Sequence, residues 1–328
     1  MGGSVMQRLW QRMRLNHFVV LGRVGMDLYA DPPGTRIEEA QRFTAAIGGS
    51  AGNIAVALAR QGAKAALLTG VSDDAVGRYC QAELARYGVE TTHVRVVGGE
   101  ARNSLAVVET IPNNAQTVLY RNGAADFALS EADVMSVDYS SAAALVVTGT
   151  ALAREPSRSA TFAAMRAAHA SKALVVLDID YRAYSWTSGD EATRLCREAA
   201  SKADIVIGND DEFGLLAGDY AQGRALAQAL AHNGALFTIY KRGVSGAVTF
   251  TPDFSFDTGV FAVKSLKPMG AGDGFMGGLL AALGRGHTLE NAVRRGAATA
   301  ALIVAGVGCA PASPDQATLD RFISGHRP

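Results

Sequence analysis

Short apolar runs recur along the chain, each bounded by glycine, aspartate or asparagine. They cover residues 17–22, 63–70, 143–149, 174–178, 205–208 and 236–240. Runs of this length without polar alternation are typical of strands that are buried on both faces. Helical stretches lie between them, at 53–60, 158–170, 193–200 and 224–231. This alternation predicts a layered α/β fold with a mostly parallel sheet, whose ligands bind beyond the carboxyl ends of the strands.

Two segments interrupt the alternation. Residues 27–47 contain an Asp-Pro-Pro-Gly turn and a strand-like end at 42–47, and residues 94–121 predict successive strands around a turn at 112–114. We expect these segments to form a small separate sheet that covers the ligand edge as a lid and excludes water. The predicted division is a core of 16–27, 48–92 and 127–328 and a lid of 28–47 and 93–126.

Composition narrows the class of ligand. The 328 residues carry 31 basic and 31 acidic side chains, so no positive excess is available to neutralise nucleic acid, and a small-molecule ligand is expected. The three cysteines are isolated, which indicates neither a disulfide framework nor a zinc site and favours a reducing cytoplasm. Residues 296–312 are too short an apolar run to span a membrane, and residues 1–15 lack the apolar core of a secretory signal.

A glycine-rich segment, Gly270 to Gly274, precedes the apolar run 275–283. Glycine allows close approach of the backbone to a ligand, and the first amides of a helix have no intrahelical acceptor, so this segment suits an anion such as phosphate. An aspartate beside a phosphate repels it unless it removes the proton from an attacking hydroxyl, which makes Asp273 a candidate general base. The alternative is that Asp273 is an ordinary helix N-cap.

A second glycine turn precedes the helix from residue 54. Gly48 and Gly49 would let sugar hydroxyls approach the backbone, and Asn53 offers a donor and an acceptor; the alternative is an asparagine-capped helix start. Asp27 follows the first strand, where it could accept hydrogen bonds from hydroxyls, or it is a solvated loop acid.

The same turn also matches another class of enzyme. Gly48, Ser50 and Gly52 have the spacing of the nucleophile elbow of a serine hydrolase. An elbow must follow a core strand, however, and residues 42–47 fall in the expected lid. The hydrolase is therefore kept as a distant alternative.

Two polar segments follow later strands. Asn209 and Glu212 provide oxygen atoms that suit Mg²⁺ bridging to phosphates, or they form an acidic helix start. The segment from Lys241 to Gly246 offers a cation and backbone donors for a nucleotide phosphate, or it is only a hairpin turn. The chain contains no Gly-Lys dipeptide and hence no P-loop, so a kinase here must be of another design.

Four motifs in this order resemble the ribokinase-like (PfkB) carbohydrate kinases over residues 17–312. They are Gly48-Gly49-x-x-x-Asn53, Asn209-x-x-Glu212, Lys241-x-Gly243-x-x-Gly246 and Gly270-Ala271-Gly272-Asp273. The resemblance implies a three-layer α/β/α sandwich with a β-sheet lid, ATP as phosphoryl donor, Mg²⁺, and lid sheets that often pair into homodimers.

The resemblance also implies roles for single residues. Asp273 would be the catalytic base, and Gly270, Ala271 and Gly272 would form the anion hole. The sugar would contact Asp27, Gly48, Gly49 and Asn53. The nucleotide would contact Lys241, Gly243, Gly246, Gly272 and Asn209, while Asn209 and Glu212 would hold Mg²⁺ indirectly.

A narrower resemblance concerns the acceptor. Residues 22–40, 120–126, 146–158, 177–182 and 266–275 are similar to the family members that phosphorylate the 6-hydroxyl of 5-dehydro-2-deoxygluconate in myo-inositol breakdown. Such a substrate carries a carboxylate, which Arg102, Arg121 or Arg182 could clamp through a bidentate guanidinium. Arg121 and Arg182 are taken as substrate-binding candidates, without a ranking among the three.

Lys267 stands where many family members have an aspartate that helps bind an activating potassium ion. Because its ammonium would replace that ion, we expect activity without potassium. Two further alternatives stay open at this point: a kinase of another sugar or sugar acid, such as 2-keto-3-deoxygluconate or fructose, and a sugar-binding sensor without catalysis.

Overall fold

A nine-stranded sheet forms the centre of the protein. The computed structural model describes residues 2–111, 114–266 and 269–326. Seven strands of the sheet run parallel and two antiparallel strands complete one edge. In spatial order they are β13 (Ser255–Thr258), β12 (Ala247–Phe250), β11 (Phe237–Lys241), β10 (Ile205–Asn209), β9 (Leu174–Asp178), β8 (Ala144–Thr148), β1 (His17–Leu21), β4 (Lys64–Ser72) and β5 (Val94–Val97).

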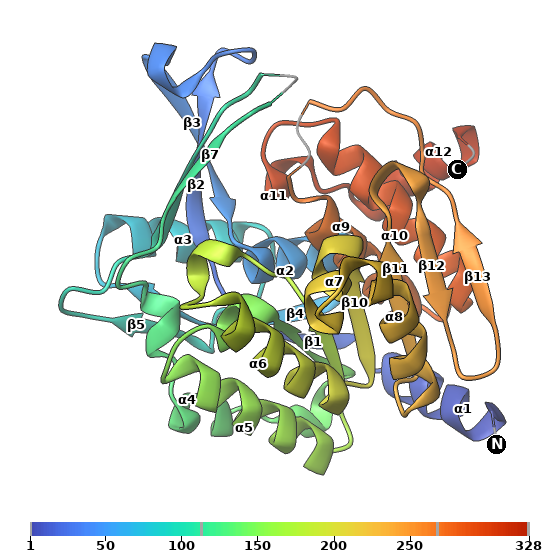
Figure 1. The fold of residues 1–328 in the computed structure, drawn as a ribbon. Coiled ribbons are helices and arrows are strands. Elements are labelled where there is room, and N and C mark those ends of the chain that lie inside the picture. Colours follow the sequence, from blue (N-terminus) through green and yellow to red (C-terminus); the bar gives the residue numbers. More distant parts are fainter. Residues whose placement is uncertain (1, 112–113, 267–268, 327–328) are drawn as a thin grey trace.

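Helices cover both faces of this sheet (Figure 1). One face carries α1 (Gly2–Met13), α2 (Ser50–Arg60), α3 (Ala75–Arg86), α9 (Ala271–Gly284) and α10 (Leu289–Val304). The other carries α4 (Glu131–Met135), α5 (Ser157–Ala170), α6 (Gly189–Lys202), α7 (Asp210–Ala217) and α8 (Gly223–His232). Two further helices, α11 (Cys309–Ala312) and α12 (Gln316–Gly325), close the chain. The predicted three-layer α/β/α fold is confirmed.

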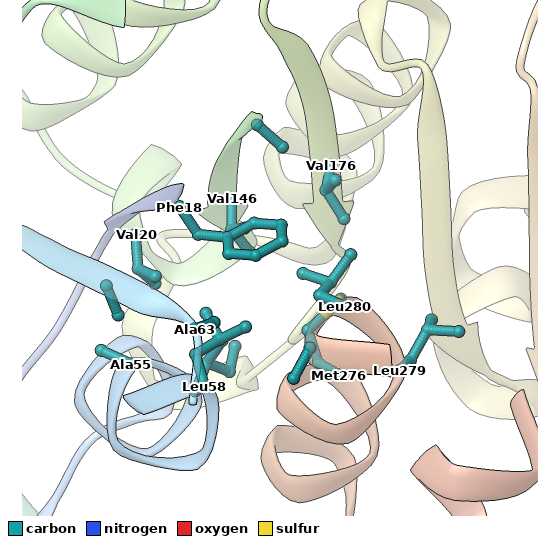
Figure 2. Close-up of a cluster of buried hydrophobic side chains, with 14 of the residues drawn as sticks. Phe18, Val20, Ala55, Leu58, Ala63, Val146, Val176, Met276, Leu279 and Leu280 are labelled. Atoms are coloured by element: carbon teal, nitrogen blue, oxygen red, sulfur yellow. The ribbon is translucent and has the colours of Figure 1, made fainter. Parts of the chain in front are cut away.

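The continuous apolar runs pack against the helices on both faces of the sheet, because successive side chains of a strand point to opposite faces. In β1, Phe18 and Val20 join the core under α2 and α9, whereas Val19 and Leu21 join the core under the other layer. Figure 2 shows the first of these cores, where Phe18 and Val20 lie with Leu58 of α2 and other buried side chains.

Close packing of α9 places its first turn beside α2. This helix is buried from residue 273 to 284, as expected for a helix that is apolar all round. A Cβ on Gly277 would lie 2.4 Å from the Cβ of Ala57, so only glycine permits this approach. One turn nearer the amino ends of both helices, Asn53 and Asp273 are therefore neighbours.

A four-stranded sheet rises from the body of the protein (Figure 1). Its order is β3 (Arg42–Gly48), β2 (Gly25–Asp31), β6 (Ser104–Val108) and β7 (Thr117–Tyr120), with β2 and β6 parallel and the other pairs antiparallel. All four strands contain residues of the two segments expected to form a lid.

Three details differ from the expected boundaries or lie beyond the structure. β5 belongs to the large sheet, where it pairs with β4, although the expected lid segment 93–126 includes it. A short edge strand carries no pattern that selects one sheet over another. β2 begins at residue 25, so Asp27 lies in the small sheet rather than in the core segment 16–27. The predicted turn at 112–114 lies mostly outside the described residues.

None of the described helices is both long and apolar enough to cross a membrane.

Candidate active site

A cavity of about 1190 Å³ lies between the carboxyl ends of the large sheet's strands and the small sheet. Its volume suits a nucleotide together with a small acceptor. Of the residues singled out from the sequence, those that line the cavity are Asp27, Gly49, Ser50, Asn53, Arg182, Asn209, Glu212, Lys241, Gly243, Gly246, Gly270, Ala271, Gly272 and Asp273. Gly48 and Arg121 do not line it.

The first turn of α9 exposes backbone donors to the cavity. Gly270 precedes the helix with φ of 81°, in the left-handed region that favours glycine, and a Cβ there would lie 2.2 Å from Cys309 Sγ. The first intrahelical hydrogen bond of this turn runs from the Gly274 amide to the Gly270 carbonyl. The amides of Ala271 and Gly272 therefore have no intrahelical acceptor and can donate to an anion.

Asp273 lies inside this first turn and is not its N-cap, which is Gly270. The side chain is buried, and its Oδ2 accepts a hydrogen bond of 2.7 Å from Asn53 Nδ2. Burial, and then the charge of Asp180, raise the pKa of Asp273 to about 6, against the opposing effects of Asn53, Arg182 and Lys241. The carboxylate is thus ionised at neutral pH, yet basic enough to accept a proton from a hydroxyl.

Asn53 contributes one more polar atom. Its Oδ1 is buried and has no hydrogen-bond partner among the described residues. A buried acceptor without a donor costs free energy unless a ligand supplies the donor. Asn53 can therefore hold Asp273 with its amide nitrogen and accept a ligand hydroxyl with its oxygen.

Asp27 is buried on β2 rather than solvated in a loop, and its Oδ2 accepts a hydrogen bond of 3.2 Å from the Tyr29 hydroxyl. A Cβ on Gly48 would lie 2.1 Å from Asp27 Oδ1. Gly49 has φ of 89°, and its Cβ would lie 2.5 Å from the Arg23 carbonyl oxygen. Gly48 thus makes room for the Asp27 carboxylate, and Gly49 makes the tight turn into α2.

Two aspartates at this edge were not singled out from the sequence. Asp178 ends β9, and Asp180 follows it with φ of 38° and an ion pair of 2.9 Å to Arg182. Burial, together with the charges of Asp180, Glu212 and Asp273, raises the pKa of Asp178, while Lys241 opposes the rise. Their position directly after the apolar run 174–178 was the available signal, because parallel strands end at a common edge.

Asn209 and Glu212 form a capping box at the start of α7. The Glu212 amide donates to Asn209 Oδ1 at 2.8 Å, and the Asn209 amide donates to Glu212 Oε2 at 2.7 Å. The expected alternative, an acidic helix start, therefore describes their local structure. The same box holds both side chains at the cavity, and Glu212 Oε1 accepts a further bond of 3.2 Å from the Tyr181 amide.

Carboxylates outnumber cations at this end of the cavity. Four carboxylates, Asp178, Asp180, Glu212 and Asp273, face two cations, Arg182 and Lys241. In the parts of the chain that the structure describes, no three His, Cys, Asp or Glu side chains are grouped as ligands of one metal ion. The excess negative charge and the oxygen donors fit a divalent cation that keeps most of its waters and enters with phosphates.

Lys241 and the two following glycines form a cradle at the end of β11. Gly243 and Gly246 have φ of 54° and 81°, and a Cβ on Gly246 would lie 2.1 Å from the Thr258 carbonyl oxygen. Lys241 Nζ would be 3.3 Å from a Cβ on Gly272, so its ammonium reaches the first turn of α9. The segment is a hairpin, as the simpler alternative held, and Lys241, Gly243 and Gly246 line the cavity.

The three candidate arginines have different surroundings. Arg121 is buried away from the cavity, where its guanidinium pairs with Asp126 at 2.5 Å and donates to Ser185 Oγ at 2.8 Å. Arg102 is exposed and donates to backbone carbonyls of its own loop. Arg182 lines the cavity but is paired with Asp180. The structure therefore does not bring Arg121 to the site, because an acid five residues along the chain engages it.

The surroundings of Ser50 do not match those of a serine hydrolase nucleophile. Ser50 begins α2 after β3 of the small sheet, not after a strand of the large one. No histidine of the described chain lines the cavity. The arrangement offers a carboxylate base and anion donors, but no histidine that would activate a serine.

Comparison with known proteins agrees with this chemistry. Residues 15–316 match the pfkB family of carbohydrate kinases. The 5-dehydro-2-deoxygluconokinase of Photobacterium profundum is 38% identical over 310 residues, 93% of this chain and 94% of that protein. The enzyme of the same name from Geobacillus kaustophilus is 32% identical over 315 residues, 94% of each chain.

A solved structure shows the same fold. The double-mutant fructokinase of Vibrio cholerae, in its fructose-, ADP- and potassium-bound form, superimposes with a TM-score of 0.81 at 27% identity, covering 94% of this chain and 98% of that one. The glycine-rich start of α9 with its aspartate, the cradle after β11 and the family match all point to phosphoryl transfer to a sugar. This chain belongs to the pfkB family of carbohydrate kinases.

Proposed function

We propose that this protein transfers the γ-phosphoryl group of ATP to the 6-hydroxyl of 5-dehydro-2-deoxygluconate. One observation carries the chemistry: a buried aspartate, Asp273, in the first turn of α9, with a pKa of about 6 and held by Asn53. The names of the two bacterial relatives support the choice of sugar acid.

The acceptor would lie against Asp27, Gly49 and Asn53, with its terminal hydroxyl at Asp273. Asp273 accepts the hydroxyl proton as the oxygen attacks the γ-phosphorus, and the bond from that phosphorus to the oxygen of ADP breaks. The amides of Ala271 and Gly272 donate to the charge that develops on the transferring group. A positioned base contributes about 10² to 10⁴-fold to such a step.

The nucleotide phosphates would lie along Lys241, Gly243 and Gly246. Asn209 and Glu212 would hold Mg²⁺ through water molecules, since both Glu212 oxygens already accept backbone hydrogen bonds. When bound, the metal ion neutralises charge on the phosphates. The further proposal that Lys267 replaces an activating potassium ion concerns a residue outside those described.

The small sheet would act as a lid, because side chains of β6 and β7, such as Ala106 and Leu119, line the cavity. Its outer strands also expose Phe43 and Tyr120. We therefore propose that two copies pair through this sheet, which sedimentation of the purified protein would report as a dimer.

The test is ADP release from Mg-ATP with 5-dehydro-2-deoxygluconate, 2-keto-3-deoxygluconate or fructose as acceptor. Turnover with the first acceptor supports the proposal, whereas turnover with only one of the others keeps the kinase and changes its substrate. Asp273→Asn should lower kcat at least about 100-fold without lowering the melting temperature. Asp253→Asn, an exposed change outside the cavity, is the matched control. Normal turnover by a folded Asp273→Asn protein would show that Asp273 is not the base.

A further inference from the structure

Three cations of the described chain line the cavity, and one of them has neither a carboxylate partner nor an assigned role. Arg182 is paired with Asp180 at 2.9 Å, and Lys241 reaches the first turn of α9. Arg23 lines the same cavity and forms no ion pair with any residue that the structure describes. A guanidinium held at a cavity wall without a carboxylate partner is suited to bind an anionic ligand.

The backbone of Arg23 is tied to the acceptor end of the cavity. Residue 23 lies between β1 and β2, and its carbonyl oxygen accepts a hydrogen bond of 3.2 Å from the Gly52 amide at the start of α2. The same carbonyl oxygen leaves no room for a side chain on Gly49, where a Cβ would lie 2.5 Å from it. Arg23 is thus packed against the turn that carries Asn53, on the side where the acceptor would bind.

The side chain of Arg23 is oriented by the small sheet. Its Nη1 donates to Ser104 Oγ at 3.0 Å, and Ser104 is a buried residue at the start of β6. One hydroxyl engages a single nitrogen of the guanidinium, which leaves other N–H groups for a ligand. The guanidinium is therefore held in place by Ser104, and it retains N–H groups that can donate to a ligand.

We infer that Arg23 binds the carboxylate of the acceptor and makes the enzyme selective for a sugar acid. The inference rests on the proposed function. With the reacting hydroxyl at Asp273, the carboxylate of the acid is at the other end of a six-carbon chain, and the cavity wall beside the Gly49 turn includes Arg23. The cavity carries more carboxylates than cations, so an anionic acceptor needs a cation among its contacts. Arg102 and Arg121 lie outside the cavity, and Arg182 is already paired.

The test compares the sugar acid with its uncharged primary amide as acceptors, at saturating Mg-ATP. In Arg23→Gln, the ratio of kcat/KM for the acid to kcat/KM for the amide should fall about 100-fold, mainly through the KM of the acid, because a charge-assisted pair is lost. Arg23→Lys keeps the charge without the bidentate fork and should recover part of the ratio. Arg102→Gln is the matched control, and its ratio should equal that of the wild type.

The outcomes separate the two proposals. If the wild type does not prefer the acid to the amide, the sugar-acid function fails, and the role of Arg23 fails with it. If the wild type prefers the acid and Arg23→Gln keeps that preference, the function stands and Arg23 is not the carboxylate ligand. Equal losses for both acceptors in Arg23→Gln would likewise overturn the inference, since they would indicate a role in folding. If Arg23→Gln does not fold, Arg23→Lys is the test: a ratio of kcat/KM for the acid to kcat/KM for the amide equal to that of the wild type would overturn the proposed bidentate role of Arg23.

Discussion

The hydrogen bond from Asn53 to Asp273 should set the pH at which the enzyme loses activity in acid. A general base works only when it is deprotonated, so kcat/KM should fall tenfold per pH unit below the pKa of Asp273, which is about 6. Asn53 lowers that pKa because its amide stabilises the carboxylate. Removing this bond in Asn53→Ala should therefore move the acid limb of the profile to higher pH.

The size of the shift follows from the one bond that is lost. A hydrogen bond to a charged group contributes about 1.5–3 kcal/mol, and one pKa unit corresponds to about 1.4 kcal/mol. Water that enters the space left by the side chain returns part of this free energy. We therefore expect a midpoint near pH 7, about one unit above that of the wild type.

The assay is ADP formation at limiting sugar acid and saturating Mg-ATP, measured from about pH 5 to pH 9. Asn53→Ala will also weaken acceptor binding, so the midpoint of the limb, not the height of the profile, is the quantity to compare. Ser50→Ala is the control, since Ser50 lies in the first turn of the same helix and has no hydrogen bond to Asp273. All three proteins share the same substrates, whose own ionisations therefore cancel. A midpoint that does not move in Asn53→Ala, or a wild-type midpoint near 4, would refute the reasoning.

Three further predictions concern other parts of the site. Gly48→Ala should raise the KM for the acceptor at least about tenfold, because the added Cβ would displace the Asp27 carboxylate. Gly34→Ala is the control, since a Cβ there meets no atom within 4 Å. Equal KM values for the Gly48→Ala and Gly34→Ala proteins would contradict the assignment of Asp27. Arg121→Leu should lower the free energy of unfolding by about 3–5 kcal/mol in denaturant titrations, because Asp126 is left buried and unpaired; an unchanged midpoint would show that the pair is not stabilising. Exchange of sodium for potassium in the assay buffer should leave the rate of ADP formation unchanged. A strong activation by potassium would contradict the proposed role of Lys267.

Most of the large sheet could be predicted from the sequence because its strands are continuous apolar runs separated by helical stretches. Parallel strands all end at one edge, so the polar residues that follow them were expected to meet. That reasoning placed Asp27, Asn209 and Lys241 at one edge, and all three line one cavity. It failed for β5, whose four residues have no pattern that distinguishes the large sheet from the small one.

Single side-chain partners could not be predicted in this way. Arg121 was a reasonable candidate for a substrate carboxylate, yet Asp126 engages it in the folded protein. Arg23 lies between the first strand and Asp27 in a segment where the sequence pointed to Asp27 alone, and the orientation of its guanidinium depends on Ser104 of the small sheet. Whether an arginine is paired or available depends on residues that folding brings to it.

The sequence by itself determined the layered α/β fold, the family and the residue types that carry the chemistry, because apolar periodicity and glycine-rich turns are local properties of the chain. Only the tertiary structure decided the environment of those residues. The amide of Asn53 meets the carboxylate of Asp273 across a separation of 220 residues, and Gly277 lets α9 pack closely enough on α2 for this contact. Burial and the charge of Asp180 then raise the pKa of Asp273. These effects act through space, so they appear only when the helices and strands are packed together.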